Sequence, residues 1–193
     1  GAIGAMVPDA ARPGRVQPMV NPSYSAVDPR LGRVEYRDRK RWLWALSVVY
    51  PLVPFTGIGL HAATGQPLWL LLPLVIGYVG GPILDAWLGE DRNNPPEAVV
   101  PQLEADRYYR RLTYAVVPLH FLALIGCAVW AGTQNLPWWA FGALAYVAGT
   151  TSGLGINTGH ELGHKHTALE QWLAKLVLAV PAYGHFRIEH NRG

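Results

Sequence analysis

Histidines gather near the end of the sequence at a spacing that suits metal chemistry. In the run Asn157–Lys165, His160 and His164 are four residues apart and therefore share one face of a helix. Two imidazoles at that spacing can bind one metal ion. A second cluster, Gly184–Gly193, contains His190, and we expect it to bring this third imidazole to the same centre.

Two kinds of metal chemistry fit these residues. The HExxH pattern is first of all the signature of zinc hydrolases, with Glu161 as the general base that activates water and Glu189 as a further possible ligand. A membrane-embedded zinc endopeptidase is therefore one hypothesis. Several neutral imidazoles suit iron as well as zinc. Iron with open coordination positions can activate O₂ for attack on a C–H bond, which is the second hypothesis. Histidines four residues apart also occur by chance, but their place at the end of a long apolar stretch favours a metal site.

The elements that must position these residues are apolar and long. The 193-residue chain is only 15% charged, and Trp42 to Leu84 and Leu112 to Gly159 contain no Asp, Glu, Lys or Arg. Each block is about twice the roughly 20 residues that a membrane-crossing helix needs, and turn residues break each block once. We predict an all-α integral membrane protein of helical hairpins with proline-kinked transmembrane helices and a histidine-rich metal site at their cytoplasmic ends. The expected spans lie near 42–62, 67–88, 112–131 and 137–158.

This composition excludes several classes of protein. An ordinary soluble domain would need a charged outer face on these segments, and a disordered chain would be less apolar. The isoelectric point near 9.1 comes from basic residues beside the apolar spans, without the basic stripe expected of a nucleic-acid-binding protein. We therefore expect a lipid bilayer as the environment and no nucleic acid as a partner.

The positive charges fall on one side of the predicted spans. Residues 1–41 carry eight Lys or Arg and 89–111 carry four, whereas the predicted turns at 63–67 and 132–137 carry none. This asymmetry predicts that the N-terminus and the metal site face the cytoplasm from the inner membrane. Residues 1–40 are basic and rich in Pro, so we expect a mobile tail there and a transmembrane domain over 41–193. The apolar stretch near 169–183 is short, and we expect a shallow or re-entrant helix that returns His190 to the site.

Three stretches resemble the membrane-bound alkane 1-monooxygenase family, and the similarity runs from about Arg41 to Gly193. They are Leu84–Glu97, Asn157–Lys165 and Gly184–Gly193. The resemblance implies a non-haem diiron centre, held almost wholly by histidines on the cytoplasmic side of a six-helix membrane domain. It further implies O₂-dependent hydroxylation of the terminal methyl group of an alkane, with electrons from rubredoxin.

Carried over by motif position, His160, His164 and His190 would be iron ligands, and Glu161 and Glu189 would orient imidazole N–H groups. The sequence departs from the family pattern at Gly193, where the family continues into two more ligand histidines. The later histidine motif and the last two membrane helices are also absent. Three ligands are too few for two iron ions, so we expect a portion truncated at the C-terminal end and inactive by itself.

An alkyl chain would also need a path from the bilayer to the metal. Small residues thin the first helices, and we expect Gly57 and Gly59 to line such a path, with helix packing as the alternative explanation. For His120, within the third span, a hydrogen-bonded core position is favoured, and a place on the substrate path is the alternative.

Overall fold

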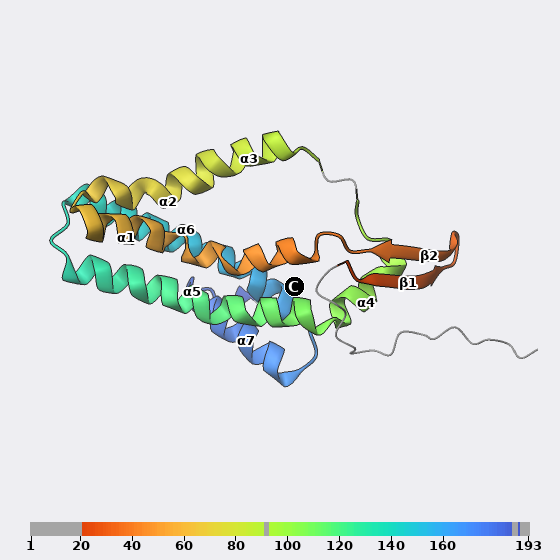
Figure 1. Ribbon diagram of the computed structural model, residues 1–193. Helices are drawn as coiled ribbons and strands as arrows, with labels where there is room; N and C mark the ends of the chain where they lie inside the picture. The colour runs from red at the N-terminus through yellow and green to blue at the C-terminus, as the bar shows by residue number, and fades with distance from the viewer. Residues whose placement is uncertain (1–20, 91–92, 187–188, 190–193) are drawn as a thin grey trace, which may run out of the picture. The chain divides into compact units, whose positions relative to one another are not determined.

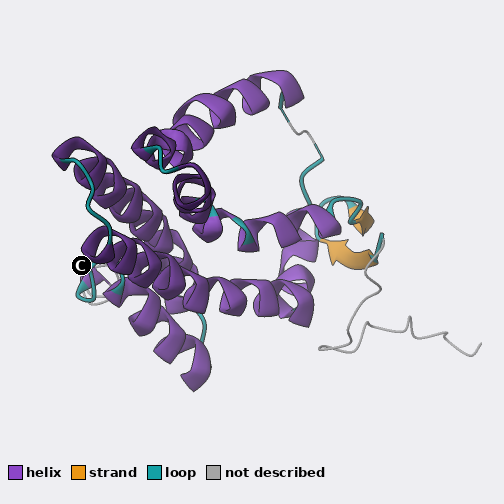
Figure 2. Cartoon of the chain, turned by 60° about the vertical axis from the view of Figure 1, so that its left-hand side comes forward, coloured by secondary structure: helices purple, strands orange, loops and turns teal. Residues whose placement is uncertain are grey.

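The computed structural model describes residues 21–90, 93–186 and 189, and these residues are mostly helical (Figures 1 and 2). They form two compact units, which we describe separately. Of the described residues, the first unit takes in 21–45 and 93–112, and the second takes in 46–90, 113–186 and 189. The candidate site lies in the second unit.

The first helical stretch begins in the first unit, continues into the second, and is broken by prolines. Short 3-10 segments, Arg41–Val48 and Tyr50–Leu52, precede helix α1, Pro54–Thr64, with a bend of 53° at the break. Proline lacks the N–H group that a helix needs and its ring clashes with the preceding turn, so the break coincides with the prolines of this segment. Helix α1 ends at Gly65, whose φ of 71° is the left-handed conformation that glycine adopts at helix ends.

The next helix, Pro67–Leu88, is continuous but irregular. A 3-10 turn, Pro67–Leu71, leads into α2, Leu72–Val75, and then into a π-helical segment, Ile76–Gly80, before α3, Gly81–Leu88. Its first turns pack closely on α1. A Cβ atom at Gly57 would lie 2.7 Å from the carbonyl oxygen of Trp69, so this glycine is required by helix contact.

Three further helices complete the second unit. Helix α5, Arg107–Thr133, begins in the first unit and is followed by α6, Trp138–Gly163, and α7, Ala168–Ala179. The N-terminus of α7 is capped by Thr167, whose side chain accepts a hydrogen bond from the Glu170 amide and whose hydroxyl donates to Glu170 Oε2 at 2.6 Å. Buried apolar residues of α5, α6 and α7 form one core cluster, comprising Val117, Leu162, Ala174 and Val177.

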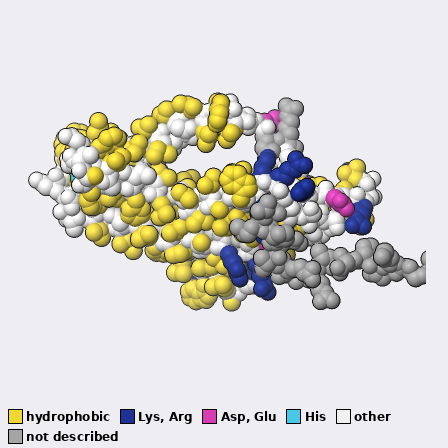
Figure 3. All heavy atoms as spheres, in the orientation of Figure 1, with side chains coloured by type: hydrophobic (Ala, Val, Ile, Leu, Met, Phe, Trp, Pro, Cys, Tyr) yellow, Lys and Arg dark blue, Asp and Glu magenta, His cyan; other side chains and the backbone are white. Residues whose placement is uncertain are grey.

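Among the described residues, two helices are long and apolar enough to cross a membrane. They are Pro67–Leu88 and Arg107–Thr133, and the bent pair Arg41–Leu52 and Pro54–Thr64 passes the same test if taken together. Helix α6 coincides with the fourth predicted span, but Gly, Thr, Asn and His in its second half lower its hydropathy, and it is not among these helices. The protein is therefore a helical membrane protein, and four crossings stay a prediction. Hydrophobic side chains cover the visible face of the helical part (Figure 3).

The first unit contains a β-hairpin within the region expected to be a mobile tail. Strand β1, Ser23–Asp28, pairs antiparallel with β2, Gly32–Arg37, so the expectation does not hold for these residues; residues 1–20 lie outside the described part. The reason is a buried polar cluster that sequence pattern does not reveal. Arg41 binds Asp106 with both terminal guanidinium nitrogens, Nη1 at 2.7 Å and Nη2 at 3.1 Å, and Tyr24 of β1 donates to the same carboxylate at 2.7 Å. These contacts anchor the hairpin.

Candidate metal centre

The two histidines of the HExxH motif face each other at the end of α6. The Nε2 atoms of His160 and His164 are 3.1 Å apart, and their ring centroids are 4.6 Å apart with the planes at 82°. Two nitrogens that each lie about 2.1 Å from one ion at a right angle are separated by about 3.0 Å. The separation is close to that of two ligands bound at a right angle to one metal ion, and it is also a hydrogen-bond distance between the two rings.

The glutamate between these histidines has a cationic partner. Glu161 Oε1 lies 2.9 Å from Lys165 Nζ, one helical turn away, and the Glu161 side chain is about half exposed. The sequence analysis expects Glu161 to orient an imidazole or to act as a general base. The ion pair directs at least one of its carboxylate oxygens along the helix surface toward Lys165.

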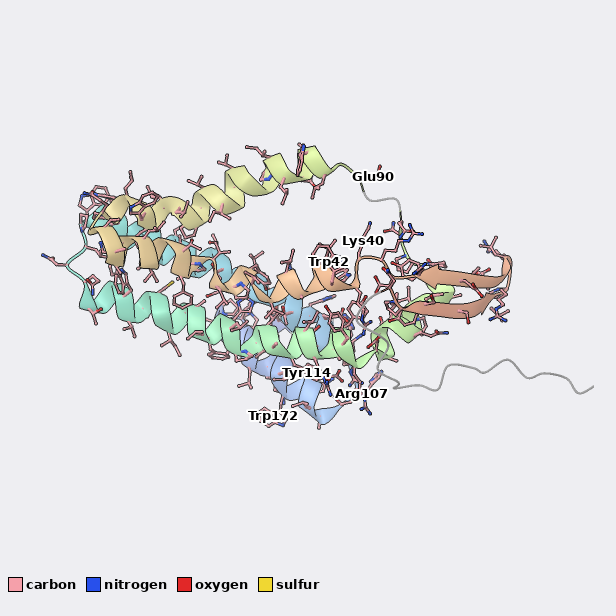
Figure 4. All side chains as sticks on the ribbon, in the orientation of Figure 1. Lys40, Trp42, Glu90, Arg107, Tyr114 and Trp172 are labelled. Carbon is pink, nitrogen blue, oxygen red and sulfur yellow. The ribbon has the colours of Figure 1, made fainter. Side chains whose placement is uncertain are left out.

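Helix α7 folds back along α6, which returns the chain toward the histidine pair. A Cβ atom at Gly159 would lie 2.6 Å from Leu178 Cγ, and one at Gly155 would lie 3.3 Å from Val177 Cγ2, so the two helices touch through these glycines. Near the other end of α7, Gln171 donates to the carbonyl oxygens of Gly163, at 3.4 Å, and of Lys165. Tyr114 of α5 lies beside α7 and donates to the buried Glu170 at 2.7 Å (Figure 4).

The chain reverses directly after α7. Pro181 follows the helix, Ala182 adopts a left-handed φ of 58°, and the Tyr183 amide donates back to Leu178 at 2.9 Å. With 12 residues, α7 is about 18 Å long, well short of the roughly 30 Å hydrocarbon core. The length is compatible with a shallow or re-entrant helix, and its depth in a membrane stays a prediction.

This reversal places the beginning of the second histidine cluster against the first. The ring of Phe186 lies 6.2 Å from that of His160, and Tyr183 packs on Phe186 with the centroids 5.4 Å apart. His185 Nε2 is 3.8 Å from Glu189 Oε1. The predicted ligand His190 lies outside the described residues, and within them no group of three His, Cys, Asp or Glu side chains is placed to hold a metal ion.

A polar trio lies deeper in the bundle than the histidine pair. His120 of α5 is 1% exposed, and its Nε2 is 2.8 Å from the hydroxyl of Tyr50. The Tyr50 hydroxyl also forms a hydrogen bond with Thr158, two residues before His160. His120 is thus a hydrogen-bonded core residue, the favoured sequence interpretation. The sequence analysis missed Tyr50 and Thr158, because an aromatic and a hydroxyl residue inside an apolar block give no pattern that distinguishes them from packing residues.

The second unit contains an apolar cavity of about 530 Å³ next to this trio. One wall comes from α6, another from the Pro67–Leu88 helix, and Tyr50 and Val53 also contribute. The expected channel residues lie elsewhere: Gly57 is buried at the contact with Trp69, whereas Gly59 is exposed and a Cβ there would meet nothing within 4 Å.

Comparison with known proteins identifies the relatives of this chain. It is 54% identical over 159 residues to an alkane 1-monooxygenase of Ectopseudomonas oleovorans. The aligned residues make up 82% of this chain and 40% of that protein. The chain is a homologue of the alkane 1-monooxygenases. A second alkane 1-monooxygenase, from Alcanivorax borkumensis, is 54% identical over 158 residues, covering 82% of this chain and 39% of the relative. That of Acinetobacter baylyi is 33% identical over 162 residues, covering 81% and 39%.

The chain spans about two fifths of the length of these alkane 1-monooxygenases. No protein-family model matches it. The relatives are oxidoreductases by name, in agreement with the resemblance in the sequence.

Proposed function

We propose that this chain is part of an enzyme that hydroxylates the terminal methyl group of alkanes to give 1-alkanols. The relatives carry the name alkane 1-monooxygenase, and the chain spans two fifths of their length, so the proposal concerns the full-length protein. The structural observation that carries it is the placement of a convergent histidine pair and an apolar cavity on the same helix, α6.

The spacing along α6 links these two features. Gly153 lines the cavity and His160 follows it by seven residues, which is two helical turns, or about 10 Å. Residues seven apart share one face of a helix, so the cavity lies directly along the helix from the histidine pair. A hydrocarbon chain in this cavity would point one end toward the metal site without meeting a charged side chain.

Each part of the site has its own task in this proposal. His160 and His164 would hold iron together with His190 and ligands from the remainder of the protein, as a diiron centre. Bound iron supplies the activation of O₂ that attack on an unactivated C–H bond requires. The cavity walls would exclude water and orient the alkane. Glu161 and Glu189 would orient the imidazole N–H groups.

The setting of the enzyme follows from the same reasoning. The positive charges before the first span and before α5 favour an inner-membrane protein whose metal site faces the cytoplasm. Rubredoxin is the proposed electron donor, by resemblance to the family. An apolar substrate that is dissolved in the bilayer would reach a cavity within the membrane without crossing water.

Metal analysis and product analysis of the full-length protein test this proposal. We expect about two iron ions per chain and O₂-dependent formation of 1-octanol from octane in the presence of rubredoxin. His160→Ala and His164→Ala should each lower the iron content and abolish the product. His166→Ala is the matched control, because His166 is exposed and lies outside the pair. One zinc ion per chain with peptide hydrolysis would refute the proposal.

A further inference from the structure

Two tyrosines join the walls of the cavity at its outer edge. Tyr78, in the π-helical segment, lines the cavity, and Tyr146 of α6 precedes Val147, which also lines it. Their hydroxyl oxygens are 3.2 Å apart, and their rings are stacked with the centroids 6.5 Å apart. Tyr78 is 60% exposed and Tyr146 54%, so the pair lies on the side of the cavity that faces away from the bundle.

The hydroxyl contact has a clear energetic reason in a membrane. A phenolic hydroxyl that faces hydrocarbon has no water to bind, and leaving it without a partner is costly. Tyr78 and Tyr146 share one hydrogen bond, in which one hydroxyl is the donor and the other the acceptor. The contact therefore favours a state in which the Pro67–Leu88 helix and α6 are connected across the mouth of the cavity.

The backbone around Tyr78 is suited to movement. A π-helical turn such as Ile76–Gly80 is rare and is found frequently at functional sites. Gly77 and the pair Gly80 and Gly81 occur here without being needed for packing: a Cβ at Gly77 would meet nothing within 4 Å, and at the other two nothing nearer than 3.7 Å. Glycine at positions that tolerate a side chain adds backbone freedom, in contrast to Gly57 at its tight contact.

We propose that Tyr78 and Tyr146 form a latch across the mouth of the cavity, and that this latch restricts entry to slim, unbranched hydrocarbon chains. The proposal rests on the proposed hydroxylation for its substrate. With the hydroxyl contact made, a chain enters only where it can pass the stacked rings. With the contact broken, the π-helical segment moves away from α6 and bulkier chains enter.

Removal of one hydroxyl at a time tests the latch in the full-length enzyme, reconstituted in nanodiscs. Tyr78→Phe and Tyr146→Phe keep both rings and remove the contact. Each variant is given an equimolar mixture of octane and a methyl-branched octane, and the ratio of branched to straight product is measured. We expect the ratio to rise about five-fold, the change that one neutral hydrogen bond supports. The double variant should match the singles, because all three lack the same contact.

A control and a second measurement make the result specific. Tyr36→Phe removes a hydroxyl from the hairpin, outside the unit that holds the cavity, and should leave the ratio unchanged. Labelling by an alkane with a diazirine at its branched end reports cavity entry without catalysis, through mass spectrometry of the peptide that contains Leu154. Labelling should increase in both tyrosine variants.

The two measurements separate the failure of the latch from the failure of the proposed function. Absent hydroxylation with increased labelling in Tyr78→Phe would refute the proposed function and support the latch. An unchanged product ratio in an active enzyme, or unchanged labelling in an inactive one, would overturn the latch. Because the ratio is measured within one preparation, partial unfolding of a variant does not imitate the expected result.

Discussion

The buried ion pair of the first unit gives the sharpest stability prediction. Asp106 accepts four hydrogen bonds: two from Arg41, one from the Tyr24 hydroxyl at 2.7 Å and one from the Tyr108 amide at 2.8 Å. The side chains of both ion-pair partners are 1% exposed. Asp106→Asn keeps the size of this side chain but leaves the Arg41 charge buried without its counter-charge. Breaking a buried pair in this way costs about 3–5 kcal/mol.

Amide hydrogen exchange of β1 and β2 measures this cost where it acts. A loss of about 3–5 kcal/mol raises the population of the open hairpin by roughly two to four powers of ten. We therefore expect the protected amides of residues 23–37 to exchange faster by that factor in Asp106→Asn. Asp28→Asn is the matched control in the same hairpin: Asp28 is partly exposed, its bonds lie at the surface, and an Asn oxygen can accept the same bonds from the Arg30 and Leu31 amides. Its exchange should change less than three-fold.

The pH dependence adds a second readout of the same group. Burial by itself raises the pKa of Asp106, but the hydrogen bonds from Arg41, the Tyr108 amide and Tyr24 outweigh it and hold the pKa below its ordinary value. A carboxyl group whose pKa is lower in the folded state stabilises that state at pH values above its pKa in the unfolded chain, about 3.9. This stability is lost as the pH falls through the pKa of the folded state. The acid-induced loss of protection should therefore be smaller in Asp106→Asn. Equal exchange in the variant and the parent protein would refute this account of the hairpin.

Three other substitutions test packing and the cavity. Gly57→Ala places a Cβ 2.7 Å from the Trp69 carbonyl oxygen and should cost about 1–3 kcal/mol, read as a lower melting temperature in detergent, whereas Gly59→Ala should not destabilise. Gly153→Trp fills the cavity and should shift the products of the full-length enzyme to shorter alkanols. A side chain at Gly59 would meet nothing within 4 Å, so Gly59→Trp would shift the products only if the channel expected from the sequence were correct. Thr167→Ala removes the cap of α7 and should cost about 1 kcal/mol, seen as faster exchange in the first turn of that helix.

The sequence by itself determined that this is a helical membrane protein, and it predicted where two histidines come together. Two long blocks without charge admit few structures other than membrane helices, because an unpaired backbone is costly in lipid. Because His160 and His164 are four residues apart on a helix, their side chains lie on the same face. In the structure their Nε2 atoms are 3.1 Å apart. The cytoplasmic placement and the diiron centre remain predictions, and His190 lies outside the described residues.

The tertiary structure decided what no local pattern encodes. Tyr24, Arg41 and Asp106 are separated by up to 82 residues, so only folding shows that they form the cluster that anchors a hairpin in a proline-rich, basic region. The cavity lies beside Gly77 and Tyr78 rather than beside Gly57 and Gly59. The difference is physical: a glycine in a helix can permit a close contact or leave open space, and which of these it does depends on the helix packed opposite.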